Sequence, residues 1–345
     1  MDGFCTALLA VCLAFAAFVQ GPVGAGGAPV EAEIASETVR EDRFPKTSAR
    51  FPSGVVAQPD IEYANLVGFR PLHLDLYTHE RSGPQARPLV VWIHGGAWKR
   101  GDSRTSAAYA NFPAVLASLA ARGYVVASIN YRLSGEARFP AAIQDVRAAI
   151  RYLRANAARF GIDPNRVILW GGSAGGHLAA LAATTCGLAA FDPPRLTGRF
   201  PGKAAASVIE PAVSDCVQGV VAWYGLFDLA VLTSPTDSHV SDFLGCQPRD
   251  CPKLAALASP VIHITCSSPP MLLIHGTADK TVPLQQSEEM AERLLKAGVP
   301  VETLFIPNVG HGWIGANAAD TRNASLLALR RTFEFIDAVA APKAK

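Results

Sequence analysis

Short apolar runs alternate with longer amphipathic segments through most of this chain. Each run has the length of a buried strand, and the segments between them have the length of helices. This alternation predicts a mostly parallel sheet that helices cover on both faces. The first two runs, one of which alternates with a period of two, are expected to open the sheet as an antiparallel hairpin. The expected strands lie at residues 61–66, 72–78, 89–93, 125–130, 167–170, 219–224, 271–275 and 302–306, a total of eight.

Helical spacing of apolar residues is clearest between residues 140 and 160. Gly161 follows this segment and is expected to end the helix. Further helices are expected at residues 176–184, 287–297 and 324–339. The residues that mark the buried face of the first helix are Ile143, Val146, Ile150 and Leu153.

A serine flanked by glycines stands where one expected strand runs directly into a helix. The sequence WGGSAGG at residues 170–176 fits the pattern G-x-S-x-G, with Ser173 at its centre. A serine at such a sharp turn is held in a strained backbone that exposes its hydroxyl above the sheet. Gly171 and Gly175 allow the strand and the helix to pack closely around the turn. Ser173 is therefore a candidate nucleophile, and the alternative is an ordinary turn serine.

A serine hydroxyl becomes a good nucleophile when a base removes its proton and an acid orients that base. In folds with this strand-to-helix serine, the acid and then the histidine follow it along the chain. Asp279 comes shortly after the apolar run at 271–275, and His311 stands between two glycines after the run at 302–306. Both lie past the end of a strand, where ligands bind in open α/β sheets. We therefore predict a triad of Ser173, Asp279 and His311.

Three other histidines compete with His311 for the role of base. His94 is expected to hydrogen-bond the backbone of its own loop, and His177 is expected to pack on the helix after the serine. His275 ends a strand and is expected to bond a loop carbonyl. None of the three follows Asp279, so the chain order favours His311.

Two other aspartates lie near the expected site. Asp228 also follows a strand and is the alternative acid. Asp145 lies inside the helix at 140–160 and is expected to form an ion pair or to cap a turn.

A glycine-containing loop follows the strand at 89–93 and reads HGGAW at residues 94–98. Acyl transfer passes through a tetrahedral oxyanion, which needs amide donors that are fixed in advance. Glycines let the main chain approach a substrate carbonyl closely. The expected oxyanion-hole residues are Gly95, Gly96, Ala97 and Ala174.

Aromatic residues stand beside each of these loops. They either line the substrate pocket or pack within the core, and the sequence leaves both roles open. These residues are Trp98, Tyr224 and Trp313.

Together, and in this order, the motifs resemble those of α/β-hydrolases of the hormone-sensitive-lipase-like group. The chain is most similar to the feruloyl- or acetylxylan-esterase-like carboxylesterases of the BD-FAE type, over about residues 61–339. One departure is that lipases usually carry His-Gly-Gly-Gly, whereas this loop has the His-Gly-Gly-x-Trp form also found in arylformamidases and in a methylesterase of prenylated cysteine. The motifs lie at residues 94–98, 130–132, 139–140, 171–176, 224–225, 275–279 and 310–312.

The resemblance implies an α/β-hydrolase fold and a serine carboxylesterase that acts on short-chain or aryl esters. The ester is expected on a small molecule or a polysaccharide. An amidase of the arylformamidase kind, or a peptidase, is the alternative. A non-catalytic ligand-binding module is a third reading, which the presence of Ser173, Asp279 and His311 disfavours. No metal or organic cofactor is expected, and a net charge of +2 gives no reason to expect a nucleic-acid partner.

The N-terminal residues differ in kind from the rest. Residues 4–19 form an uncharged apolar run, followed by small residues, which is typical of a signal peptide although a basic start is missing. The run is shorter than the roughly 20 residues of a spanning helix. We expect a signal peptide at 1–28, a flexible lead-in at 29–59 and the catalytic domain at 60–341. The protein is thus expected to be secreted or periplasmic, without stable membrane association.

Two segments, residues 186–217 and 229–269, are longer than simple connections and contain five cysteines. We expect them to form lid-like excursions beside the acyl pocket, with a short helix near residues 253–258. Export would permit disulfides, and the alternative is buried reduced thiols. The expected pairs are Cys246–Cys251 and Cys186–Cys216, which leaves Cys266 free.

Overall fold

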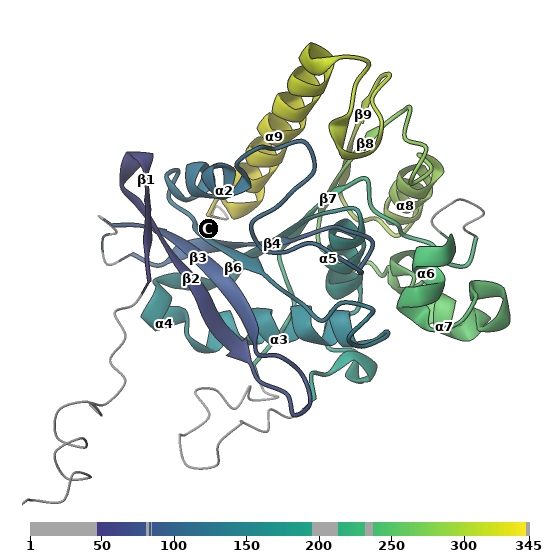
Figure 1. Cartoon of the computed structure of the whole chain (residues 1–345), viewed down its shortest axis with the longest axis horizontal. Coiled ribbons are helices and arrows are strands. Elements are labelled where there is room, and N and C mark those ends of the chain that lie inside the picture. Colours follow the sequence, from purple (N-terminus) through teal and green to yellow (C-terminus); the bar gives the residue numbers. More distant parts are fainter. Residues whose placement is uncertain (1–46, 81–82, 84, 195–212, 232–236, 343–345) are drawn as a thin grey trace, which may run out of the picture. The chain divides into compact units, whose positions relative to one another are not determined.

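The computed structural model describes residues 47–80, 83, 85–194, 213–231 and 237–342 (Figure 1). The expected signal peptide and residues 29–46 of the expected lead-in lie outside the described residues. Parts of the two cysteine-containing segments, residues 195–212 and 232–236, also lie outside them.

The described residues form a nine-stranded mixed sheet in the order β1-β2-β3-β5-β4-β6-β7-β8-β9. The pairs β1/β2, β2/β3 and β3/β5 are antiparallel, and every later pair is parallel. The carboxyl ends of β4 and β6 to β9 therefore meet at one edge. The strands are β1 (Ala49–Phe51), β2 (Val55–Ala64), β3 (Leu72–His79), β4 (Arg87–Ile93), β5 (Val125–Ile129), β6 (Ile162–Gly172), β7 (Gly219–Trp223), β8 (Met271–Gly276) and β9 (Val301–Ile306).

The start of the sheet corrects two expectations. The sheet has nine strands and not eight, because β1 precedes the expected hairpin. The sheet also begins at Ala49, so the boundary of the lead-in at residue 59 was wrong. In β2 the pairing with β3 shifts register between Gln58 and Ile61, and Asp60 has a φ of 56°. This irregularity breaks the period-two pattern by which a strand is read from sequence.

Helices cover both faces of the sheet (Figure 1). Alternate residues of β4 face opposite sides: Leu89, Val91 and Ile93 join one core cluster, whereas Val90 and Trp92 join the other. The first cluster lies under α3, α5 and α8, and the second under α2 and α9. The helices are α2 (Phe112–Ala120), α3 (Ala141–Ala155), α4 (Ala157–Phe160), α5 (Ala174–Thr184), α6 (Asp237–Leu244), α7 (Pro252–Leu257), α8 (Gln285–Lys296) and α9 (Ala318–Ala340).

The helix expected at residues 140–160 is present as α3 and α4. Gly161 follows α4 in the left-handed conformation, with a φ of 67°, and ends it as expected. The helix α9 begins earlier than expected because the side chain of Asn317 accepts a hydrogen bond from the amide of Asp320. The residues expected on the buried face of the first helix, all fully buried, are Ile143, Val146, Ile150 and Leu153.

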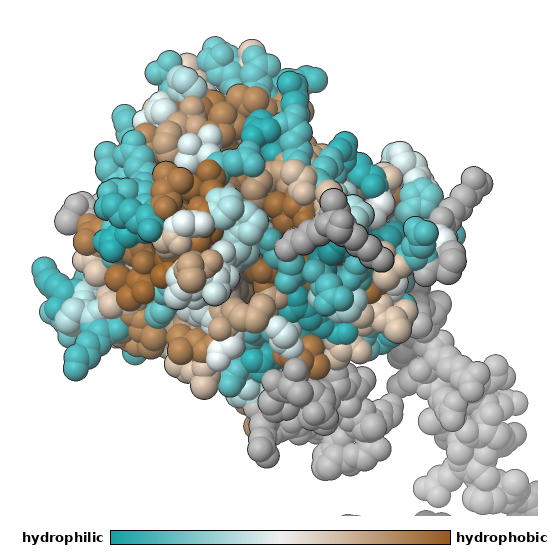
Figure 2. Space-filling view, turned by 180° about the vertical axis from the view of Figure 1, so that it is seen from behind, coloured by the Kyte–Doolittle hydropathy of each residue, from teal (hydrophilic) through white to brown (hydrophobic). Residues whose placement is uncertain are grey.

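Neither the mix of residues on one face of the molecule nor the character of the helices indicates a membrane-spanning helix among the described residues. On the face shown in Figure 2, apolar residues are interspersed with polar ones, as on most folded domains. Within the part of the chain that the structure describes, none of the helices combines the length and the apolar character that crossing a bilayer requires.

The described parts of the second cysteine-containing segment are largely helical. The short helix expected near residues 253–258 is α7, and α6 precedes it. Both expected disulfides are present, Cys186–Cys216 and Cys246–Cys251, and Cys266 is free and exposed.

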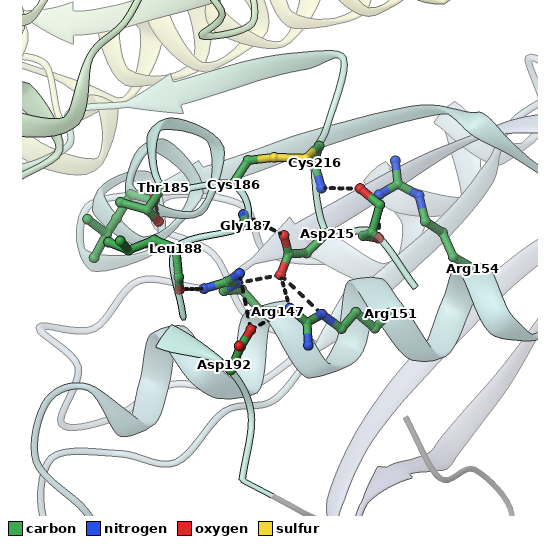
Figure 3. A network of polar contacts seen from close by, with 12 residues as sticks. Arg147, Arg151, Arg154, Thr185, Cys186, Gly187, Leu188, Asp192, Asp215 and Cys216 are labelled. Carbon is green, nitrogen blue, oxygen red and sulfur yellow. Dashed lines mark hydrogen bonds and ion pairs between the residues drawn. A yellow bond between two sulfur atoms is a disulfide. The ribbon is translucent and has the colours of Figure 1, made fainter. Parts of the chain in front are cut away.

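The Cys186–Cys216 disulfide lies beside a network of buried charges (Figure 3). Gly187 follows one of the two cysteines and Asp215 precedes the other. The amide of Gly187 donates a hydrogen bond to Asp215 Oδ1 over 3.2 Å. The Asp215 carboxylate also accepts hydrogen bonds from arginines of α3. The disulfide joins the described ends of the first cysteine-containing segment, and the Asp215 carboxylate attaches them to α3.

Candidate active site

Ser173 lies on the sharp turn between β6 and α5. Its φ is 56° and its ψ is −123°, a conformation that is strained for any residue with a side chain. The amide of Ser173 donates to the carbonyl of Trp223 in β7 over 2.8 Å, which fixes the turn to the neighbouring strand. A Cβ atom on Gly175 would overlap the carbonyl of Ile93 in β4. Gly175, two residues after the serine, is thus required for helix α5 to approach the sheet.

The structure brings Ser173, His311 and Asp279 together at the carboxyl edge of the parallel strands. His311 Nε2 lies 3.1 Å from Ser173 Oγ, and His311 Nδ1 lies 2.7 Å from Asp279 Oδ2. An ionised carboxylate only accepts hydrogen bonds, so Nδ1 carries the proton and Nε2 is left to accept from the serine hydroxyl. The other oxygen, Asp279 Oδ1, accepts from the amides of Thr281 and Val282 over 2.8 and 2.9 Å.

The Asp279 carboxylate is buried, yet its surroundings favour the charged form. Burial alone would raise the pKa of this carboxyl. Hydrogen bonds from His275 and His311, followed by the amide of Val282, outweigh burial and hold the pKa well below its usual range. Asp279 is therefore ionised at neutral pH and can stabilise a charged imidazole at His311.

The 94–98 loop lies directly against the serine turn. A Cβ atom on Gly95 would come within 2.6 Å of the carbonyl oxygen of Gly172 and 3.2 Å of Ser173 Cβ. The two segments are thus in backbone contact, and a side chain at position 95 would separate them.

The backbone of this loop is held in a tight turn. Gly96 has a φ of 102°, and its carbonyl accepts hydrogen bonds from the amides of Lys99 and Arg100 over 3.0 and 3.1 Å. Ala97 also has a positive φ, of 56°. In the adjacent serine turn, Ala174 is the first residue of α5, where the helix amides have no intrahelical acceptor. The expected oxyanion donors therefore belong to two segments that lie side by side.

We expect Gly95→Ala to lower kcat/KM for an ester by roughly 100- to 1000-fold, the range for loss of one oxyanion donor. The added methyl group cannot fit against the Gly172 carbonyl, so the loop must move away from Ser173. Steady-state kinetics measure the effect, with thermal melting as a check on folding. Gly135→Ala is the matched control, because nothing lies within 4 Å of a Cβ there. Equal kinetics for the two variants would contradict the expected role of the loop.

Two of the competing histidines have the structural roles expected for them. His94 Nδ1 donates to the carbonyl of Gly95 over 2.7 Å and so shapes its own loop. His177 is packed in α5, where Nε2 donates to the carbonyl of Ala258 over 2.8 Å and Nδ1 accepts from the Trp98 indole over 3.2 Å. Burial lowers the pKa of both imidazoles to about 4, so both are neutral at pH 7.

His275 has a contact that the sequence did not predict. Its Nε2 lies 3.0 Å from the carbonyl of Val282, which confirms the expected bond to the loop. The same nitrogen also lies 3.3 Å from Asp279 Oδ2. The only sequence feature that hints at this contact is that His275 and Asp279 are four residues apart. The two side chains meet because the loop turns back on the end of β8.

The competing aspartates have other partners. Asp228 Oδ1 accepts from the amide of Ala230 over 2.9 Å and so shapes a turn. Asp145 forms the expected ion pair, in which its carboxylate lies 2.7 Å from the guanidinium of Arg132, and both side chains are buried.

The three aromatic residues beside the loops differ in their surroundings. Trp98 is 1% exposed and stacks on Phe243, with ring centroids 4.4 Å apart. Trp313 is fully buried and meets Tyr224 edge-on at 4.6 Å. The Tyr224 ring also lies 4.6 Å from that of His311. Trp98 and Trp313 are therefore packing residues in this structure, and Tyr224 is the aromatic residue that contacts the site.

One group of potential metal ligands lies outside the site. Among the described residues, Cys186, Asp215 and Cys216 have ligand atoms within 4.8 Å of one another. The two sulfur atoms are bonded to each other, and Arg147 and Arg151 bind the carboxylate. The group is thus a structural cluster.

The sheet, the serine on its strained turn after β6, the acid after β8 and the histidine after β9 define an α/β-hydrolase. The model of the BD-FAE family matches residues 74–294. The chain belongs to this family.

Several proteins named as esterases are similar to the chain. It is 36% identical over 267 residues to esterase LipC of Mycobacterium tuberculosis, a match that covers 75% of this chain and 62% of LipC. A truncated carbohydrate esterase from gut microbiota is 28% identical, with a TM-score of 0.66 and coverage of 86% of this chain and 98% of that one. Esterase 2 of Thermogutta terrifontis is 26% identical, with a TM-score of 0.63 and coverage of 83% and 94%. The chain thus spans less than two thirds of the length of LipC.

Proposed function

We propose that this chain is a serine carboxylesterase that hydrolyses short-chain or aryl esters. The observation that carries the proposal is the hydrogen-bonded series from Ser173 Oγ through His311 to the buried Asp279 carboxylate. The 94–98 loop, in backbone contact with the serine turn, supports it. The similarity to proteins named esterase and carbohydrate esterase also supports it.

In the first half of the reaction, Ser173 Oγ attacks the ester carbonyl carbon while His311 Nε2 takes the hydroxyl proton. Asp279 holds the imidazole in the required tautomer and stabilises its positive charge. The negative charge on the carbonyl oxygen is met by amides of the 94–98 loop and of Ala174. His311 then returns the proton to the alkoxy oxygen, the C–O bond breaks, and the alcohol leaves an acyl-serine.

In the second half, water takes the place of the alcohol. His311 Nε2 removes a proton from the water as its oxygen attacks the acyl carbon, and the second tetrahedral intermediate forms in the same oxyanion hole. Its collapse breaks the bond to Ser173 Oγ, which regains its proton from His311. The products are the carboxylic acid and the free enzyme, so atoms and protons balance over the cycle.

A substrate panel tests the proposal. We expect turnover of p-nitrophenyl acetate and of longer acyl esters, with acetylated xylan and methyl ferulate included to test polysaccharide-linked and aryl substrates. N-formylkynurenine tests the amidase alternative, which the His-Gly-Gly-x-Trp motif at residues 94–98 favours. A higher kcat/KM on the formamide than on every ester would overturn the carboxylesterase proposal. A fluorophosphonate probe that failed to label Ser173 would favour a binding module.

We also propose that the chain is exported, with a signal peptide at residues 1–28 and a catalytic domain that follows it. The apolar run at residues 4–19 supports this. Two disulfides support it as well, since disulfides persist in oxidising compartments. N-terminal sequencing of the protein recovered from the periplasm or the culture medium tests it. An intact N-terminus in the cytoplasmic fraction would contradict it.

A further inference from the structure

A second imidazole lies against the acid of the site. His275, in β8, is fully buried, and each of its ring nitrogens has a partner. Nε2 lies 3.0 Å from the carbonyl oxygen of Val282 and 3.3 Å from Asp279 Oδ2. Nδ1 lies 2.7 Å from Ser287 Oγ in α8, and Ser287 is also fully buried.

These partners determine which nitrogen carries the proton. A carbonyl oxygen and an ionised carboxylate only accept hydrogen bonds, so Nε2 of His275 must be the donor to both. In the neutral ring Nδ1 is then an acceptor, and the hydroxyl of Ser287 donates to it. Ser287 therefore favours the tautomer in which His275 points an N–H group toward Asp279.

Asp279 Oδ2 thus receives N–H groups from two imidazoles. One is Nδ1 of His311, at 2.7 Å, and the other is Nε2 of His275. The amides of Thr281 and Val282 occupy Oδ1. Four donors hold the carboxylate, so its orientation is fixed, and its negative charge is divided between His311 and the other three.

We propose that His275, oriented by Ser287, is a positioning residue that fixes the Asp279 carboxylate and limits the negative charge that it presents to His311. The inference rests on the proposed function, because it assigns His275 a task within the same site. A merely structural His275 would only attach the loop to β8 through Val282.

Among the described residues, the other titratable groups around this pair are tyrosines. The Tyr224 ring lies against His311, and Tyr109 interacts electrostatically with Tyr224. Burial raises the pKa of both phenols, so both stay neutral through the range in which a histidine titrates. Lys280, the next residue after Asp279, is exposed. A change in the titration of His311 after substitution of His275 therefore reports on the contact with Asp279.

The test compares three variants by kinetics and by NMR titration of the His311 imidazole. His275→Leu removes the donor, His275→Gln keeps an N–H group near the position of Nε2, and Ser287→Ala removes only the partner of Nδ1. With Leu we expect kcat to fall about 10- to 100-fold, the range for one hydrogen bond to a charged group, with KM within about twofold of its original value. Gln is expected to restore most of the loss.

The titration supplies the readout that a structural role would not move. Without the His275 donor, Asp279 presents more negative charge to His311 and stabilises the imidazolium, so the titration midpoint moves to higher pH. The acid limb of kcat/KM is expected to move in the same direction. Ser287→Ala is expected to produce a smaller shift of the same sign, and it decides the matter if His275→Leu does not fold.

The proposal is overturned if the midpoint is unchanged or moves to lower pH, or if Gln is no better than Leu. The NMR measurement needs no substrate. An absence of ester turnover by the unaltered protein would therefore count against the proposed function and leave the role of His275 to be judged by the titration.

Discussion

Ser173→Ala is expected to reduce kcat for p-nitrophenyl acetate by roughly 10⁴- to 10⁶-fold, because the residues of such a site act as a unit and the attacking oxygen is lost. His311 Nε2 lies 3.1 Å from that oxygen, which is the group that it would deprotonate. Alanine fits wherever serine does, so the melting temperature is expected to stay within a few degrees. Stopped-flow or steady-state kinetics measure the loss, and labelling by a fluorophosphonate probe is expected to disappear with it.

Two comparisons make this result specific. Ser134→Ala is the matched control, since Ser134 Oγ is buried and has no hydrogen-bond partner among the described residues. It is expected to leave kcat unchanged. The double variant Ser173→Ala, His311→Ala is expected to be no slower than Ser173→Ala alone, since His311 has no task without the serine. A single variant that kept one tenth of the activity would show that another residue is the nucleophile.

The parts of this site that sequence predicts well are those that each follow a strand. His311 lies 138 residues after Ser173 and 32 residues after Asp279, the two residues that it contacts. Each of the three comes just after an apolar run. Parallel strands place their carboxyl ends at one edge, so the order of the runs suffices to bring the three residues together. The structural roles of His94 and His177 were also predictable from the elements that carry them.

What sequence could not predict depends on partners that no local pattern identifies. The contact of His275 with Asp279 depends on the path of a loop, and its contact with Ser287 depends on where α8 docks. Trp98 stands beside the site in sequence but packs on Phe243, which is far away along the chain. A charged residue such as Arg147 predicts a solvent-exposed position, and its complete burial follows only from a carboxylate 68 residues away.

That buried arginine belongs to the network beside the first disulfide (Figure 3). Arg147 Nε donates to Asp215 Oδ2 over 2.5 Å, and its Nη1 donates to the carbonyl of Leu188 over 2.6 Å. Arg151 Nη2 donates to Asp215 Oδ2 over 2.8 Å and to Asp192 over 2.6 Å. Asp215 is thus the acceptor that two buried guanidinium groups share.

We expect Asp215→Ala to lower the free energy of unfolding by about 3–5 kcal/mol, the range found when one member of a buried ion pair is removed. The guanidinium groups of Arg147 and Arg151 would stay buried without the carboxylate that binds both of them. Denaturant titration without reductant measures the loss while the Cys186–Cys216 disulfide stays closed. Asp192→Ala is the matched control. Its side chain is 49% exposed, so we expect a loss of at most about 1 kcal/mol.

The pH dependence of the Asp215→Ala effect separates lost charge from lost packing. Burial would raise the pKa of the Asp215 carboxyl, but Arg147 and Arg151 outweigh it and lower the pKa below its ordinary value. A group with a lowered pKa in the folded state contributes its full stabilisation above the unfolded value, about 3.9, and loses it as the pH falls through the folded value. The stability difference between the unaltered protein and Asp215→Ala is therefore expected to be constant from about pH 5 to 7 and to narrow below about pH 4. A difference of the same size at every pH would show that Asp215 acts through packing, because packing does not depend on the proton.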